Sequence, residues 1–131
     1  MTNKAMGLSP ACLKTLAKVE ANPNKSNQHE LHGIRELKAI LGMNEAHHRG
    51  IFSIRGEPTT ATVDLTWYDA RLEHPTRTEH RLYFETNPVM SRAQAGDNLL
   101  IGFDGQRQLH CVLIPKSAPD HAANNGSWEP A

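Results

Sequence analysis

Two polar segments carry the side chains with the clearest chemistry in this sequence. The first runs from His74 to Arg81 and holds two arginines, two histidines and one glutamate. Arg77 and Arg81 can each present a guanidinium fork to O6 and N7 of a guanine, and Glu79 can accept from a cytosine amino group or orient a neighbouring arginine. Taken alone, a solvated hairpin loop with weak surface ion pairs is the simpler interpretation.

The second segment spans residues 22–30 and is polar almost without interruption. Its asparagines and glutamine can pair with N6 and N7 of adenine, and its lysine and serine can hold phosphates. Turn-forming asparagines that cap a following helix are the alternative, which composition alone favours. Two such polar loops would suit a nucleic-acid groove if the fold made them neighbours.

Other chemistry finds less support. His47 and His48 are adjacent and cannot both face one ion from a regular helix, while His110 and Cys111 would point to opposite faces of a strand. A nuclease needs clustered carboxylates with a lysine, and no Glu-x-Lys comes after Asp120. We therefore assign no catalytic residue and no metal ligand in this chain.

Composition limits the partners. Fourteen Lys and Arg balance fourteen Asp and Glu among 131 residues, so the formal net charge is zero. A protein that coats DNA without regard to sequence takes its affinity from an excess of cations, so any nucleic-acid contact here must be local. Cys12 and Cys111 have no metal-binding spacing and are expected to be reduced, partly buried thiols of a cytoplasmic protein. No run of residues is long and apolar enough to suggest a membrane span or signal peptide.

The apolar pattern separates two short helices from a strand-rich second half. Ser9-Pro10 followed by Leu13 and Leu16 predicts a helix over 10–20, and the residues after Gly33 predict another that ends at Gly42. Runs rich in β-branched and aromatic residues predict strands, and Asp104-Gly105 predicts a hairpin. A short helical turn is expected over 90–95. The predicted strands are IFSIR, ATVDLTWY, RLYF, NLLIGF and QLHCVLIP.

These elements predict a mainly β (α+β) domain, an open or closed barrel with short peripheral helices. We expect it to occupy residues 1–116. The small, polar, proline-rich residues 117–131 are expected to be a flexible tail or the start of a linker.

The ordered set LTWYDAR, HPTRTEHRLYF and AQAGDNLLIGF, with an apolar strand ending at Pro115, resembles the N-terminal effector domain of EcoRII-like type II restriction endonucleases. The earlier stretch KTLAKVEANPNKSNQHELHGIRELKAIL is similar to the N-terminal arm of that family. The resemblance covers roughly residues 14–116, and no single motif in it is specific by itself.

The resemblance implies a seven-stranded DNA-binding pseudobarrel of the plant B-three type, in which two arms grip the major groove. It implies binding of double-stranded DNA at a CCWGG-like site, where W is A or T. The chain would be a non-enzymatic effector domain of a prokaryotic, cytoplasmic restriction endonuclease, monomeric in isolation. Mg²⁺ would serve only the absent catalytic domain, and this chain would need no cofactor.

Carried over by position, the resemblance and the side-chain chemistry identify eleven DNA-binding candidates. We call residues 24–29 the N-terminal arm and residues 77–81 the C-terminal arm. This sequence has Asn24 to Asn27 where EcoRII has a glycine-rich segment, and Pro75 where that arm has a lysine. A complete metal-dependent nuclease and a barrel that binds protein or single-stranded RNA stay as alternatives. The candidates are Asn24, Lys25, Ser26, Asn27, Gln28, His29, Arg77, Thr78, Glu79, His80 and Arg81.

Overall fold

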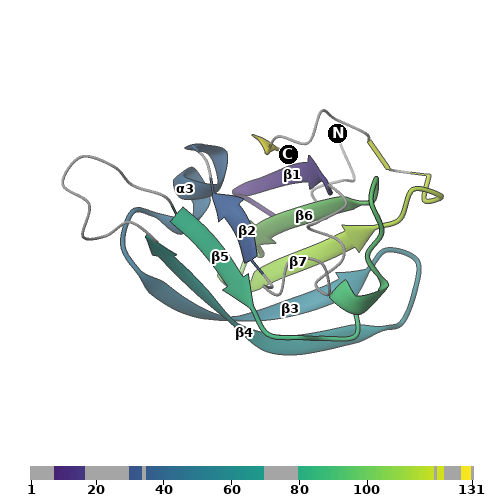
Figure 1. The fold of residues 1–131 in the computed structure, drawn as a ribbon, viewed down its shortest axis with the longest axis horizontal. Coiled ribbons are helices and arrows are strands. Elements are labelled where there is room, and N and C mark those ends of the chain that lie inside the picture. Colours follow the sequence, from purple (N-terminus) through teal and green to yellow (C-terminus); the bar gives the residue numbers. More distant parts are fainter. Residues whose placement is uncertain are drawn as a thin grey trace.

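One curled sheet organises the molecule (Figure 1). The structure is a computed structural model, and it describes residues 8–16, 30–33, 35–69, 80–119, 121–122 and 128–130. Within these residues the strand order is β2-β5-β4-β3-β7-β6-β1-β8, antiparallel except for the β3–β7 pair. The strands are β1 Ala11–Thr15, β2 Glu30–Gly33, β3 Ala46–Ile54, β4 Thr60–Asp69, β5 His80–Phe84, β6 Asn98–Phe103, β7 Leu109–Ile114 and β8 Glu129–Pro130.

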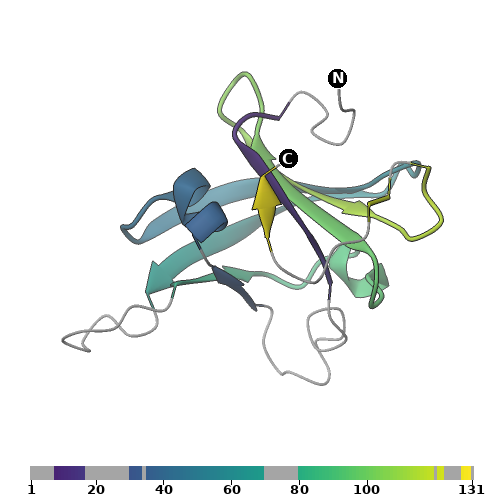
Figure 2. The same cartoon turned by 90° about the horizontal axis from the view of Figure 1, so that it is seen from above.

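The predicted mainly β pseudobarrel is confirmed. Seven strands of four or more residues build the sheet in the described part of the chain, and the two-residue β8 extends it beyond β1. Figure 2 shows β1 crossing steeply over the direction of β3 and β4, so the sheet is strongly twisted. Inward side chains from most strands form one apolar cluster with Leu37 and Leu41 of the helix α3 (Arg35–Leu41).

The helix predicted after Gly33 is confirmed as α3. It ends at Gly42, which has a φ of +89° and donates its N–H to the carbonyl of Lys38 at 2.7 Å. A left-handed residue at that place suits glycine because glycine has no Cβ to clash. The helical turn expected over 90–95 is also present, as the 3-10 helix η2 (Met90–Arg92). No helix among the residues that the structure describes has the length and apolar character that crossing a membrane requires.

The helix predicted over 10–20 is wrong for residues 11–15, which form β1. This strand pairs with β6 on one side and β8 on the other. Ala11, Cys12 and Leu13 are all buried, because both faces of the strand are covered. A strand of this kind has no polar alternation, so the spacing of Leu13 and Leu16 fitted a helix by coincidence.

The predicted β6–β7 hairpin is confirmed, although its turn is not the two-residue type. Five residues, 104–108, connect the strands, and Arg107 rather than Gly105 has a positive φ, of 66°. The Asp104 carboxylate accepts the backbone N–H of Gln106 and Gln108 at 2.8 and 3.0 Å. It also contacts the His110 ring, and the bond from Gln108, followed by that to His110, lowers the pKa of Asp104.

Both cysteines are free thiols and buried, as expected. They lie on β1 and β7 in register with Ile101 on the strand between them. Burial raises the pKa of the Cys12 thiol to about 12 and raises that of Cys111 further. Both therefore act as small apolar core residues rather than nucleophiles.

Several of the residues that the structure describes after 116 contact the sheet. Trp128 is buried, with the Lys14 ammonium 5.7 Å from its ring centre, and β8 pairs with β1. Ala118 and Ala122 pack on a second apolar cluster over the outer side of β1, β6 and β7. Most residues around Trp128 have small or polar side chains, so the sequence did not predict that this tryptophan would be buried.

Candidate nucleic-acid interface

The two arms join neighbouring strands at one edge of the sheet. Residues 24–29 and 77–79 lie outside the described part of the chain, whereas the strands that come directly after them are described. Glu30 begins β2, and His80 begins β5; all four residues of β2 pair with residues 80–83 of β5. Glu30 lies opposite Tyr83, and Gly33 lies opposite His80. Because the pairing is antiparallel, the two arms enter at opposite ends of this ladder, three residues or about 10 Å apart along it.

His80 is the arm residue with the most specific surroundings, and its ring faces inward. The side chain is 2% exposed and stacks on Trp67 with ring centres 5.0 Å apart and planes 27° from parallel. Its Nε2 lies 3.0 Å from the carbonyl oxygen of Met43. The sequence suggested His80 as a DNA-contacting residue, and here its ring supports the strand instead of facing the surface.

The same aromatic pair holds the turn between α3 and β3. Trp67 is fully buried and donates its Nε1–H to the carbonyl oxygen of Gly42 at 2.8 Å. Two consecutive carbonyls, those of Gly42 and Met43, thus meet Trp67 on β4 and His80 on β5. The chain between β4, which ends at Asp69, and β5, which begins at His80, contains residues 77–79 of the C-terminal arm, so this contact fixes the turn against the end of that arm.

The outward face of β5 carries Arg81 and Tyr83. Strand alternation places His80, Leu82 and Phe84 inward, which leaves Arg81 half-buried and Tyr83 41% exposed. In register, Arg81 lies between His32 and Tyr68 on the flanking strands, and Tyr83 lies between Glu30 and Thr66. The sequence reasoning missed Tyr83 as a surface candidate, although the alternation in HRLYF is enough to predict its face.

Beyond β5 the outer face is polar and internally paired. Arg49 on β3 donates to the Asp64 carboxylate on β4 at 2.7 Å, and both side chains are more than half exposed. The Glu85 carboxylate accepts the backbone N–H of Asp64 at 2.9 Å. His47 Nδ1 lies 3.3 Å from the Thr66 hydroxyl. With two carboxylates beside one guanidinium, this part of the face does not attract an anion strongly.

His48 lies on the inner side, next to His47 on β3. Its ring meets Phe103 edge-on at 5.8 Å, and its Nε2 is buried without a hydrogen-bond partner among the described residues. Burial, and then the neighbouring His47, lowers the pKa of His48. The ring is therefore favoured in its neutral form. The described residues contain no group of three His, Cys, Asp or Glu that could hold a metal ion.

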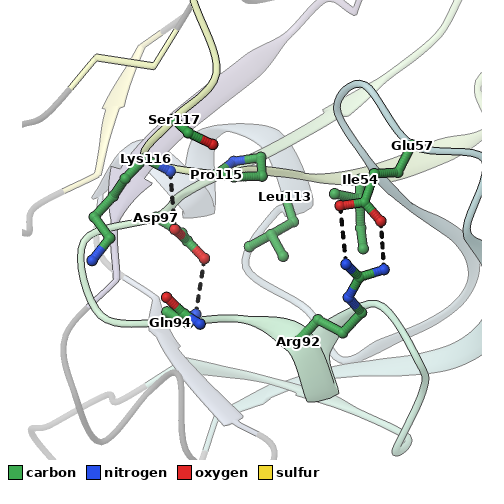
Figure 3. Close-up of a pocket in the computed structure, with 9 residues that line it drawn as sticks. All are labelled: Ile54, Glu57, Arg92, Gln94, Asp97, Leu113, Pro115, Lys116 and Ser117. Atoms are coloured by element: carbon green, nitrogen blue, oxygen red, sulfur yellow. Dashed lines mark hydrogen bonds and ion pairs between the residues drawn. The ribbon is translucent and has the colours of Figure 1, made fainter.

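A cavity of about 280 Å³ lies at the opposite end of β3 (Figure 3). Arg92 forms a two-pronged ion pair with Glu57 across one side of it, and Asp97 accepts the backbone N–H of Gln94 and of Lys116 on the other. The polar groups that Figure 3 joins by dashed lines thus already satisfy one another. The Arg92–Glu57 ion pair and the hydrogen bonds of Asp97 connect the turns at this end of the sheet.

The cavity wall also adjoins Leu16, at the end of β1. Leu16 donates its N–H to the Asp97 carbonyl at 2.8 Å and accepts the Gly96 N–H at 3.0 Å. Leu16 is the last described residue before the stretch that contains the arm. Asp97, which is buried, therefore helps to hold the end of β1 from which the chain continues toward residues 17–29.

Comparison of the chain with protein-family models, with curated proteins and with solved structures finds no match in any of the three.

Proposed function

We propose that this chain is a sequence-specific binding domain for double-stranded DNA, acting as the effector domain of a prokaryotic, cytoplasmic type II restriction endonuclease. The proposed site is CCWGG-like and is read in the major groove by the two arms. The chain itself performs no cleavage, which belongs to a separate Mg²⁺-dependent catalytic domain.

The observation that carries the proposal is the β2–β5 ladder. Two polar segments that are about fifty residues apart in sequence enter adjacent strands about 10 Å from each other. The major groove of B-DNA is about 12 Å wide. Because the ladder is antiparallel, the two segments enter from its opposite ends, so both arms would have to extend over this strand pair to meet one groove, and the short separation allows that reach.

Each arm supplies a different kind of base contact. Arg77 and Arg81 are suited to guanine, and Glu79 to a cytosine amino group, so the C-terminal arm fits the G·C pairs of the proposed site. The N-terminal arm carries Asn27 and Gln28, whose amides fit adenine at the central position. The remaining polar side chains of the two arms, including Lys25 and Ser26, fit phosphate contacts.

The inward ring of His80 gives the C-terminal arm a rigid root. Base-reading side chains discriminate only when their backbone is held in place, because a loosely held guanidinium can satisfy several acceptors. Stacking on Trp67 and contact with Met43 hold the residue directly after Glu79. In this proposal His80 positions the arm, while its neighbours Glu79 and Arg81 contact bases.

Zero net charge sets the expected salt dependence. A few phosphate contacts and several base contacts predict a moderate decrease of affinity with salt, whereas a large basic surface predicts a steep one. Asp64 on β4 and Glu85 after β5 favour the same conclusion, since two carboxylates near Arg49 make this part of the face a poor addition to a basic surface.

A binding selection tests the proposal directly. The full chain is incubated with a randomised duplex pool, bound duplexes are sequenced, and affinities for CCTGG and scrambled duplexes are measured by fluorescence anisotropy. We expect enrichment of a CCWGG-like site and weak competition by single-stranded DNA or RNA. No enrichment of any duplex, or tighter binding of single strands, would overturn the proposal. Cleavage of plasmid DNA by the chain with Mg²⁺ would instead support a complete nuclease.

Arg81→Ala provides the matched test of base reading. We expect it to weaken binding of CCTGG by about 1–3 kcal/mol and to leave binding of scrambled duplexes nearly unchanged. Thr60→Ala, at the start of β4 and exposed, serves as the control that should change neither affinity. If Arg81→Ala weakens binding of both duplexes equally, Arg81 contacts phosphates and does not read a base.

A further inference from the structure

Two large apolar side chains stand out as exposed in the described part of the chain, and both belong to segments next to the C-terminal arm. Met43 is 60% exposed in the turn between α3 and β3, and Tyr83 is 41% exposed on β5. Tyrosine carries a hydroxyl that accounts for its exposure, whereas methionine has no polar group that favours water. Met43 is therefore the side chain that needs an explanation.

A single exposed apolar side chain is common on protein surfaces and usually needs no explanation. Met43 differs because its backbone is fixed while its side chain is not packed. The carbonyl of Met43 lies 3.0 Å from His80 Nε2, and the carbonyl before it accepts from Trp67 Nε1 at 2.8 Å. Both rings are buried and stacked on each other. The fold thus presents a flexible apolar side chain on a rigid support.

The support places Met43 at the root of the proposed DNA-reading arm. His80, which contacts Met43, comes directly after Glu79 and precedes Arg81. Through this contact Met43 is an exposed apolar side chain beside the residue that follows Glu79, and it is accessible to a duplex bound next to it. The apolar feature that a major groove offers there is the 5-methyl group of thymine, which apolar side chains contact.

We propose that Met43 is a specificity-determining residue that packs against the methyl group of a thymine in the bound site. This inference rests on the proposed function, and it adds a residue that no polar motif identifies. A thioether side chain suits such a contact because it is polarizable and adjusts its shape to the partner. The central position of a CCTGG duplex supplies one thymine methyl for it.

Deoxyuridine lacks only that methyl group, so it tests the contact without changing base pairing. Affinities are measured by anisotropy for a CCTGG duplex and for the same duplex with its one site thymine replaced by deoxyuridine. The wild-type chain should bind the thymine duplex about fourfold more tightly, the ratio expected for burying one methyl group. Met43→Ala should bind the two duplexes equally, and Met43→Leu should keep most of the wild-type ratio.

Controls separate this inference from the proposed function. Thr60→Ala should keep the wild-type thymine-to-deoxyuridine ratio, and Met43→Ala should unfold at the wild-type temperature because its side chain is exposed. If the wild type prefers CCTGG over scrambled DNA but ignores the methyl group, or if Met43→Ala keeps the wild-type ratio, the inference is wrong and the proposed function stands. If the wild type shows no preference for CCTGG over scrambled DNA, the proposed recognition site is wrong, and the inference about Met43 is wrong with it.

Discussion

The outer face of the sheet changes character between β7 and β3. One row of side chains crosses this boundary in register. On β1, β6 and β7 its members are apolar and at most 2% exposed, and on β3 and β4 they are a half-buried serine and an exposed threonine. The row consists of Leu13, Leu100, Val112, Ser53 and Thr60.

The cause is coverage of one half of the sheet and not the other. Leu8, Ala118 and Ala122 pack over the outer side of β1, β6 and β7, so those strands are buried on both faces. Over β4 and β5 the described chain places no such layer, and burial alternates along each strand. We call these the covered half and the open half.

This difference in coverage predicts that one half mainly stabilises the fold and the other mainly binds a partner. A strand that is buried on both faces stabilises the fold but has no surface to offer a partner. The open half keeps its inward face for the core and leaves its outward face free, and the arms join the sheet at its outer edge. Stability should therefore depend most on the covered half and binding on the open half.

Leu100→Ala is the most severe test of this division. Leu100 is fully buried in the second apolar cluster, and its truncation should lower the free energy of unfolding by about 2–5 kcal/mol. Thr60→Ala, in the same row, should change it by less than about 0.5 kcal/mol. Urea denaturation followed by circular dichroism measures both. Similar losses at the two positions would mean that the halves do not differ in their contribution to stability.

Two strand glycines offer the next comparison. A Cβ at Gly102 would lie 2.8 Å from the Pro10 carbonyl oxygen and 2.7 Å from the Ala11 Cβ, so the covering backbone would have to move. At Gly50, in β3, the closest atom is the Leu65 Cδ1 at 2.5 Å, the end of a side chain that can rotate. We expect Gly102→Ala to destabilise by about 1–3 kcal/mol and Gly50→Ala by less. The opposite order in denaturation experiments would contradict close packing over β6.

His80→Phe should affect binding more than stability. Phenylalanine keeps a ring against Trp67 but cannot bond the Met43 carbonyl, a loss of about 1 kcal/mol. The substitution also removes the buried Nδ1, which has no hydrogen-bond partner among the described residues, and this offsets part of the cost. With its root loosened, the C-terminal arm should discriminate less between CCTGG and scrambled duplexes. If the ratio of the affinities for CCTGG and scrambled duplexes does not change, His80 does not position the arm.

The sequence predicted β4 and β5 because their residues alternate, whereas it did not predict β2 or the first five residues of β3. ATVDLTWY and RLYF have apolar residues at every second position and match β4 and β5, and IFSIR matches the last four residues of β3. The apolar runs NLLIGF and QLHCVLIP also match β6 and β7. The strand β1 was missed because ACLKT is short and is buried on both faces, so its sequence shows no alternation. Only its neighbours β6 and β8 decide its conformation.

For the proposed interface, the sequence showed which residue types are present but not which way their side chains face. The polar character of both arms is visible in the chain, and their rooting on adjacent strands is evident only from the β2–β5 register. The inward position of His80 could have been inferred, since it shares the strand face of Leu82 and Phe84. The support of the turn at Gly42 and Met43 could not, because Trp67 and His80, which contact the carbonyls of these residues, lie 25 and 37 residues away in sequence.

The smallest expected effect marks the inner boundary of the proposed interface. Arg49 and Asp64 form an ion pair on β3 and β4 with side chains that are 63% and 64% exposed. Exposed pairs contribute about 0–1 kcal/mol, so a double-mutant cycle with Arg49→Ala and Asp64→Ala should give a coupling energy in that range. Because β3 is two strands from β5, Arg49→Ala should leave affinity for CCTGG within about twofold of wild type. A loss as large as that of Arg81→Ala would extend the DNA-binding surface across the open half, past the edge where the arms are rooted.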